Sequence, residues 1–264
     1  MESAIKIIIE RDKCDGCGLC VSDCLQRTLE IRDGKAQVLS DNCLKCGHCL
    51  AICPMNAVRM EGVEDEILET GGPGGVLDAD ALKAHLKLRR SVRRYKPAPV
   101  EREKLEKIIE AGRLTPTGRN LQNVRYIVIQ NGIDAIEDEV LEQYRELQKQ
   151  AELNGDPEGF PNVRSFRLER GFLFYNAPAL ILVVSENNTN ACLAAMSMEL
   201  MAEALGLGTV YIGLFVRPAN QNEALRRSLG IAEDENIAIC LAVGYPAVTY
   251  RRSAPKKPAN IMWR

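Results

Sequence analysis

The sequence predicts an α+β or α/β fold preceded by a small cysteine-rich domain, and three observations lead to this prediction. Eight of the ten cysteines lie between residues 14 and 53. An acidic and then glycine-rich stretch, "MEGVEDEILETGGPGGVLDAD", follows them at residues 60–80. Beyond it, helical and strand patterns alternate. Because 264 residues suffice for two unequal domains, we expect a domain at 1–62, a linker at 63–78 and a larger domain at 79–264.

Composition excludes several classes of partner. The net charge of −2 argues against a chain-wide nucleic-acid or membrane footprint. No apolar run approaches the roughly 20 residues that span a bilayer, and the opening "MESAIKIIIERDK" lacks the features of a signal peptide. We therefore expect a cytoplasmic protein that binds neither nucleic acid nor membrane.

The cysteines follow the spacing C-x2-C-x2-C-x3-C twice, at an offset of 29 residues. At this spacing three thiolates bind one iron-sulfur cluster and the fourth binds the other cluster. The predicted ligand sets are Cys14, Cys17, Cys20 and Cys53 for one 4Fe-4S cluster, and Cys43, Cys46, Cys49 and Cys24 for the second. Zinc sites usually separate two C-x2-C pairs by a longer spacer, which neither set has.

With its ligands complete, this region resembles the bacterial two-cluster 4Fe-4S ferredoxins. His48 lies between two ligands, but both sets are already full, so we expect it beside the cluster or in solvent. Cys192 and Cys240 lie in apolar segments, and we expect both to be small buried hydrophobic residues. The "GGPGG" of the linker lacks the G-K-[ST] ending of a phosphate loop and is interpreted as a hinge.

The larger domain begins with two helices. The segments "ADALKAHLKLRR" (79–90) and "VEREKLEKIIEAGRL" (100–114) have apolar residues at helical spacing, and the second follows prolines and has glutamates in its first turn. Short apolar runs then predict strands at 124–130, 178–185, 209–213 and 237–245, with helices between them at 133–153, 189–205 and 219–229. The helix at 189–205 is unusually apolar, so we expect it to be thoroughly buried.

The segment "GLGTVYIG" (206–213) is rich in glycine but does not match a dinucleotide-binding loop. Tyr211 occupies the third glycine position, and the segment follows a helix instead of opening one. These glycines are better explained by a tight passage from a helix into a strand.

Four arginines lie within "RRSVRRYKP", residues 89–97. A solvated charge cluster and a nucleic-acid patch are alternatives, the latter disfavoured by the acidic overall balance. A phosphate site is the sharper interpretation, since arginine binds phosphate bidentately and Ser91 adds a hydroxyl. A second basic cluster, "YRRSAPKKP", lies near the end of the chain.

These motifs together resemble the FMN-dependent nitroreductases. The resemblance rests on "LRRSVRRYKPAPV", "PTGRNLQNVRYIVI", "AEALGLGTVYIG" and "AVGYP" with a basic tail, in this order over about residues 80–264. It implies a three-layer sheet-and-helix domain. With the cysteines in front, the whole chain is similar to the ferredoxin-nitroreductase fusions of anaerobic bacteria.

The resemblance also implies the cofactor contacts. Arg89, Arg90 and Ser91 would bind the FMN phosphate, and Arg93 would lie near the flavin N1 and O2, where a cation stabilises reduced flavin. The remaining implied contacts are Asn120 and Gln122 to the isoalloxazine edge and ribityl chain, the backbone of Tyr211, Ile212 and Gly213 to the flavin face, and Lys256 or Lys257 to the phosphate. Asn123, Val124 and Gly213 depart from the common family form, which leaves the substrate pocket undefined. The family also implies a homodimer with an exchanged C-terminal arm.

Two functional classes follow. In the first, the chain is an oxidoreductase that passes electrons through two 4Fe-4S clusters to FMN and on to a small acceptor such as a nitroaromatic, quinone or enone. Reduced ferredoxin or NAD(P)H would be the external donor. In the second, it is a non-enzymatic electron-transfer or redox-sensing adaptor that serves a protein partner. No Ser-His-Asp set or activated cysteine was identified, and His85 is expected at the surface, so we assign the chemistry to the flavin and not to a catalytic side chain.

Overall fold

The computed structural model describes residues 5–69, 77–157 and 162–264. The chain divides into two compact units, Met1–Leu77 with Gly118–Leu121, and Asp78–Thr117 with Gln122–Arg264. The last strand of the first unit ends at Glu61, and residues 63–69 have no regular structure. Of the rest of the predicted linker, the structure describes residues 77 and 78, and residues 70–76 lie outside the described residues.

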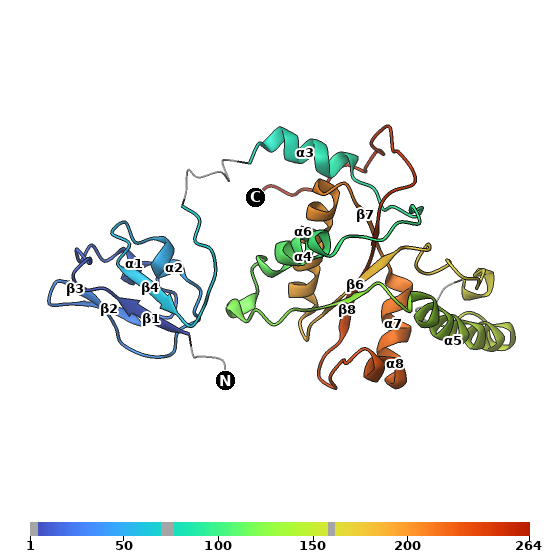
Figure 1. Ribbon diagram of the computed structural model, residues 1–264, viewed down its shortest axis with the longest axis horizontal. Helices are drawn as coiled ribbons and strands as arrows, with labels where there is room; N and C mark the ends of the chain where they lie inside the picture. Colours follow the sequence, from blue (N-terminus) through green and yellow to red (C-terminus); the bar gives the residue numbers. More distant parts are fainter. Residues whose placement is uncertain (1–4, 70–76, 158–161) are drawn as a thin grey trace. The chain divides into compact units, whose positions relative to one another are not determined.

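The first unit is built from a repeat of its own backbone (Figure 1). Strand β1 (Lys6–Ile9) pairs antiparallel with β4 (Val58–Glu61), and β2 (Leu29–Arg32) pairs antiparallel with β3 (Lys35–Val38). The short helices are α1 (Leu19–Ser22) and α2 (His48–Ala51). Helix α1, strand β1 and strand β2 each recur 29 residues later, as α2, β3 and β4. The sequence repeat is therefore a structural repeat, and each two-stranded sheet takes one strand from each half.

Glycine is required at one position of this repeat. Gly16 has φ +77°, and a Cβ placed on it would lie 2.1 Å from the carbonyl oxygen of Gly34. The equivalent position in the second half is Lys45, which has φ 54°. The two halves therefore share a backbone path but differ in how closely another segment approaches it.

The second unit contains a four-stranded antiparallel sheet in the order β5-β6-β8-β7. Its strands are β5 (Arg125–Ile129), β6 (Ala179–Val184), β7 (Gly208–Tyr211) and β8 (Ile237–Gly244). All four strands predicted from the sequence are present, and each end lies within two residues of its predicted position. The central strand β6 is buried along its whole length, as its unbroken apolar run predicts.

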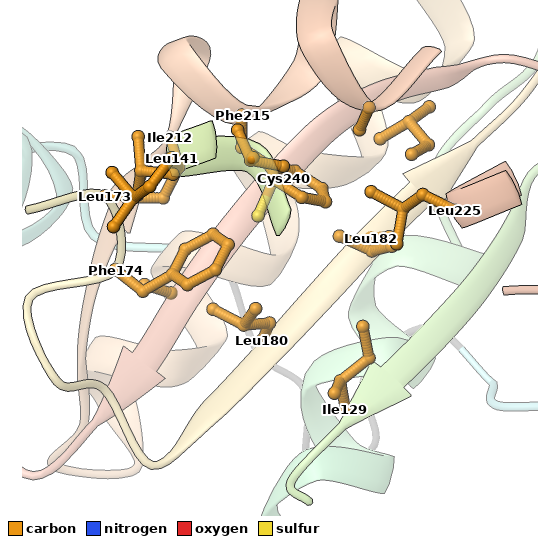
Figure 2. Packing of buried hydrophobic residues seen from close by; sticks show 14 of the residues in the cluster. Ile129, Leu141, Leu173, Phe174, Leu180, Leu182, Ile212, Phe215, Leu225 and Cys240 are labelled. Carbon is orange, nitrogen blue, oxygen red and sulfur yellow. The ribbon is translucent and has the colours of Figure 1, made fainter. Parts of the chain in front are cut away.

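Helices cover both faces of this sheet (Figure 1). One face packs against α4 (Arg102–Arg113) and α6 (Asn188–Ala204) through a core that includes Ile108, Ile181 and Met198. The other packs against α5 (Ile133–Asn154), α7 (Gly213–Gln221) and α8 (Glu223–Ser228). Figure 2 shows this second core, where Phe174 and Phe215 lie beside Cys240. The predicted three-layer α+β architecture is confirmed. The second unit also contains helix α3 (Ala79–Leu88) and a 3-10 turn at Val163–Ser165. A further 3-10 turn, Gly118–Asn120, belongs to the first unit.

The helix predicted at 219–229 is observed as two helices, α7 and α8, and the part of α7 before residue 219 was not predicted. Pro218 lies inside α7. Proline removes the N–H that would bond the carbonyl of Leu214 four residues earlier. The Tyr144 hydroxyl donates to this carbonyl at 2.7 Å, and the Tyr144 side chain is fully buried. The helix is therefore completed by a side chain from α5, which no local pattern reveals.

Helix α6 is not thoroughly buried, which corrects the expectation drawn from its apolar composition. It buries one face, including Ala191, Ala195 and Met198, but Cys192 and Leu193 on its other side are exposed. Cys192 is therefore not the buried residue that its apolar setting predicted. Cys240, on central strand β8, is 1% exposed, as expected.

Within the described residues, none of the helices combines the length and the apolar character that crossing a bilayer requires.

Candidate functional site

The eight clustered cysteines line two separate hollows in the first unit. Cys14, Cys17, Cys20 and Cys53 line one hollow together with Ile9, Asp15 and Ala36 among others. Cys24, Cys43, Cys46 and Cys49 line the other, together with Thr28, Leu44 and His48 among others. We call these the first cage and the second cage. The grouping matches the two ligand sets expected from the sequence, including the crossing of Cys24 and Cys53 between the halves.

Hydrogen-bond donors point at the sulfurs of both cages. In the first cage, the backbone N–H of Ala36 donates to Cys14 Sγ at 3.4 Å and that of Ala57 to Cys53 Sγ at 3.3 Å. In the second cage, the backbone N–H of Lys45 donates to Cys43 Sγ at 3.3 Å. Such bonds favour ionised sulfur, which is the form that binds metal.

The second cage has side-chain donors as well. Cys24 Sγ lies 3.5 Å from the backbone nitrogen and 3.4 Å from the hydroxyl of Thr28. His48 Nδ1 lies 3.0 Å from Cys46 Sγ, which places His48 beside the ligands as expected.

Burial and hydrogen bonding shift the pKa values of the cage thiols in opposite directions. Burial raises the pKa of Cys20, and it raises that of Cys49 to about 11. Burial also acts to raise the pKa of Cys24, but the hydrogen bonds from Thr28 outweigh it, so this pKa is lowered. Binding of metal at Cys20 and Cys49 must therefore supply the free energy of thiol ionisation.

The arginine segment lies against the sheet of the second unit. The backbone N–H of Val92 donates to the carbonyl of Thr209 in β7 at 2.9 Å, and Tyr95 forms a β-bridge with Pro246. The segment can approach this closely because Gly208 has no side chain: a Cβ there would lie 2.4 Å from Val92 Cγ2. Gly208 of "GLGTVYIG" thus serves the packing of the arginine segment against β7.

Arg89 forms an ion pair with a buried carboxylate that the sequence did not identify. Its Nη1 donates to Glu199 Oε1 at 2.6 Å, and Glu199, on α6, is 1% exposed. One turn later on α6, Glu203 Oε2 lies 2.9 Å from His85 Nε2. His85 is therefore partly buried and paired, and not a plain surface residue. Burial raises the pKa of Glu203, and the neighbouring His85 opposes that rise.

Residues 211–213 lie at the end of β7. Tyr211 is 36% exposed, and burial, followed by the Glu199 carboxylate, raises the pKa of its hydroxyl. Ile212 is buried in the core that Figure 2 shows, so only its backbone is available to a ligand. A Cβ on Gly213 would meet open space. The arginine segment and β7 are thus brought together as the family resemblance implies.

The other expected contacts are distributed more widely. Asn120 belongs with the first unit, where its Nδ2 donates to the carbonyls of Leu44 and Lys45 at 3.1 and 3.0 Å. Gln122 belongs to the second unit and lines a hollow with Ser185, Glu186 and Asp234 among others. The structure places these two amides in different surroundings.

The tail begins beside the arginine segment. The Tyr250 hydroxyl donates to the carbonyl of Ser91 at 3.2 Å, and the backbone N–H of Ala247 donates to the carbonyl of Arg94 at 2.8 Å. Lys256 and Lys257 are exposed. The last residues include the exposed apolar side chains Ile261, Met262 and Trp263.

Comparison with known proteins gives the same division. The sequence model of the nitroreductase family matches residues 86–245, and that of the 4Fe-4S dicluster domain matches residues 6–54. A putative NADH dehydrogenase/NAD(P)H nitroreductase of Archaeoglobus fulgidus is 29% identical over 168 residues, covering 60% of this chain and 81% of that protein. A ferredoxin of Pyrobaculum islandicum is 33% identical over 54 residues, covering 20% of this chain and 50% of that protein.

Solved structures share the fold of the second unit. A nitroreductase with bound FMN from Bacteroides fragilis is 23% identical with a TM-score of 0.53, covering 69% of this chain and 98% of that chain. A nitroreductase with bound FMN from Desulfitobacterium hafniense is also 23% identical, with a TM-score of 0.54, covering 70% of this chain and all of that chain. The family match spans more than half of the sequence, and the chain therefore belongs to the nitroreductase family of oxidoreductases, with a 4Fe-4S dicluster ferredoxin domain ahead of its nitroreductase domain.

Proposed function

We propose that this protein is an FMN-dependent reductase that passes electrons through two 4Fe-4S clusters to FMN and on to a small acceptor such as a nitroaromatic, quinone or enone. The observation that carries the proposal is the pairing of two four-cysteine cages with an arginine segment that lies against β7. We assign the cages to residues 1–62, a linker to 63–78 and the flavin site to 79–264.

Each cage is lined by four cysteines, the number of thiolates that one 4Fe-4S cluster takes. The first cage would bind through Cys14, Cys17, Cys20 and Cys53, and the second through Cys24, Cys43, Cys46 and Cys49. When bound, the clusters supply single electrons, and FMN converts one-electron supply into two-electron reduction. The backbone N–H groups of Ala36, Ala57 and Lys45 would donate to three of the sulfurs that bind the clusters.

The donor set at residues 89–93 fits a phosphate and a flavin edge. Arg89, Arg90 and the Ser91 hydroxyl would bind the phosphate, and Arg93 would stand near N1 and O2. The backbone at Tyr211, Ile212 and Gly213 would face the ring. Asn120 and Gln122 remain proposed contacts to the flavin edge, as does either Lys256 or Lys257 to the phosphate.

The assembly and the partners are proposed on chemical grounds. The tail exposes Ile261, Met262 and Trp263, which a homodimer would cover. Reduced ferredoxin or NAD(P)H would be the external donor. Eight thiols kept reduced for clusters suit the cytoplasm.

Anaerobic purification with iron, sulfide and flavin analysis tests this proposal. The expected content is about eight irons and one FMN per chain, followed by reoxidation of the reduced protein when an acceptor is added. Eight irons without FMN would refute the flavin site. Both cofactors without turnover of any small acceptor would instead favour an electron-transfer adaptor that serves a protein partner.

A further inference from the structure

We infer that the two halves of the ferredoxin repeat have diverged so that the cluster in the second cage has the higher reduction potential, through the side chains of Thr28 and His48. This inference rests on the proposed binding of one cluster in each cage. It assigns an order to the electron path: an electron in the domain resides preferentially on the cluster held by Cys24, Cys43, Cys46 and Cys49.

The repeat supplies an internal comparison, because each position has a counterpart 29 residues away. Thr28 corresponds to Ala57, and both backbone N–H groups donate to the sulfur of the cysteine four residues before them, Cys24 and Cys53. Only Thr28 adds a hydroxyl, 3.4 Å from its cysteine sulfur. Thr28 is 3% exposed, so this hydroxyl is shielded from water.

The second difference lies at the start of the short helices. His48 corresponds to Leu19, since each is the first residue of its helix. His48 Nδ1 lies 3.0 Å from Cys46 Sγ, whereas Leu19 has no polar side-chain atom to offer Cys17. A cluster-bound sulfur can only accept a hydrogen bond, so Nδ1 must carry the proton when the cluster is present. Because Cys24 crosses between the halves, both side-chain donors belong to the second cage.

Reduction adds one electron to a cluster and neither forms nor breaks a bond. The added negative charge strengthens each hydrogen bond to the sulfurs, so a cage with more donors favours the reduced form.

Charged groups near the first cage do not reverse this order. The Asp15 carboxylate lines that cage and opposes the addition of an electron, and its counterpart Leu44 in the second cage is neutral. Lys35 Nζ donates to the carbonyl of Cys14 and offsets part of the charge of Asp15. The difference in side-chain donors therefore decides the order.

Exchange of residues between the halves tests the inference. The full-length protein with its clusters and FMN is reduced stepwise at controlled potential, and electron paramagnetic resonance follows the reduced clusters. Wild-type protein should show two separate one-electron waves. Thr28→Ala and His48→Leu place each counterpart residue in the second cage, and each should lower only the upper wave. Loss of one charge-assisted hydrogen bond should change the equilibrium between oxidised and reduced cluster roughly tenfold, which shifts the reduction potential by about 59 mV for one electron.

The reverse exchanges are the matched controls. Ala57→Thr and Leu19→His should raise only the lower wave. Thr28→Ser keeps the hydroxyl and should leave both waves in place. Thr28→Val removes the hydroxyl but keeps the shape of the side chain. It should lower the upper wave even if Thr28→Ala loses iron. A shift of the lower wave by Thr28→Val or His48→Leu, or no shift at all, would overturn the inference. Fewer than two clusters per wild-type chain would overturn the proposed function itself, which iron analysis reports separately.

Discussion

Replacing Arg89 and Glu199 together by glutamine tests the phosphate site more cleanly than removing Arg89 alone. Glu199 is 1% exposed, and Arg89 Nη1 lies 2.6 Å from its carboxylate. Arg89→Ala would leave this carboxylate buried without its partner, which costs about 3–5 kcal/mol of stability. Loss of flavin from that variant would therefore report unfolding as well as binding. Arg89→Gln with Glu199→Gln removes both charges, and two amides can still hydrogen-bond.

The expected effect is specific to the phosphate of the flavin. A hydrogen bond to a charged group contributes about 1.5–3 kcal/mol, so the double variant should bind FMN roughly 10-fold to 150-fold more weakly. Riboflavin has the same ring and ribityl chain without the phosphate, so its affinity should not change. The measurement is fluorescence quenching during titration of flavin-free protein with each compound, next to a thermal melt of each variant.

The neighbouring pair on the same helix provides the control. His85→Gln with Glu203→Gln removes the ion pair one turn further along α6, and it should preserve the preference for FMN over riboflavin. If the variant at Arg89 and Glu199 melts like wild type and still prefers FMN to the same degree, the assignment of Arg89 to the phosphate is wrong.

Three further outcomes are expected. Gly16→Ala should reduce the iron content to about one cluster per chain, because the added Cβ would lie 2.1 Å from a backbone oxygen, whereas Lys45→Ala at the equivalent position should retain all of the iron. Tyr144→Phe should lower the free energy of unfolding at pH 8 by about 1–3 kcal/mol through loss of its buried hydrogen bond. Burial raises the pKa of Tyr144 to about 12, above its unfolded value of about 10. Wild-type protein should therefore lose stability as the pH rises from about 10 to about 12. Denaturant titrations at pH 9 and 11 should show a smaller loss of stability in Tyr144→Phe than in wild type. A chain that ends at Tyr250 should sediment as a monomer if residues 251–264 form a dimer arm, and a dimer of unchanged mass would exclude that role.

Much of this molecule follows from its sequence because the relevant signals are local. The cysteine spacing predicted which four cysteines line each cage, including the crossing of Cys24 and Cys53 between the halves. Strands β5, β6, β7 and β8 are apolar runs bounded by polar residues, and their ends were predicted within one or two residues. The order of the motifs in the family resemblance identified the arginine segment, which lies against β7. Each motif alone was a weak signal.

What the sequence did not reveal depends on contacts between distant residues. Helix α7 contains Pro218, and the free carbonyl of Leu214 is satisfied by Tyr144, 70 residues away. Glu199 was not identified from the sequence, because its partner Arg89 is 110 residues away. Cys192 was misjudged because apolar neighbours in sequence do not determine which side of a helix faces the sheet.

The duplicated domain also shows why ligand spacing alone does not define an electron carrier. Both halves of the repeat have the same four-cysteine spacing and the same backbone path, so spacing predicts two equivalent clusters. The donors that distinguish them, Thr28 and His48, are residues that no ligand motif includes. Because hydrogen bonds to sulfur shift the potential of a cluster, a repeat can keep all of its ligands and still acquire a direction for electron flow. Such a direction needs only that side-chain donors gather on one cage, and here the crossing of Cys24 places both of them on the second.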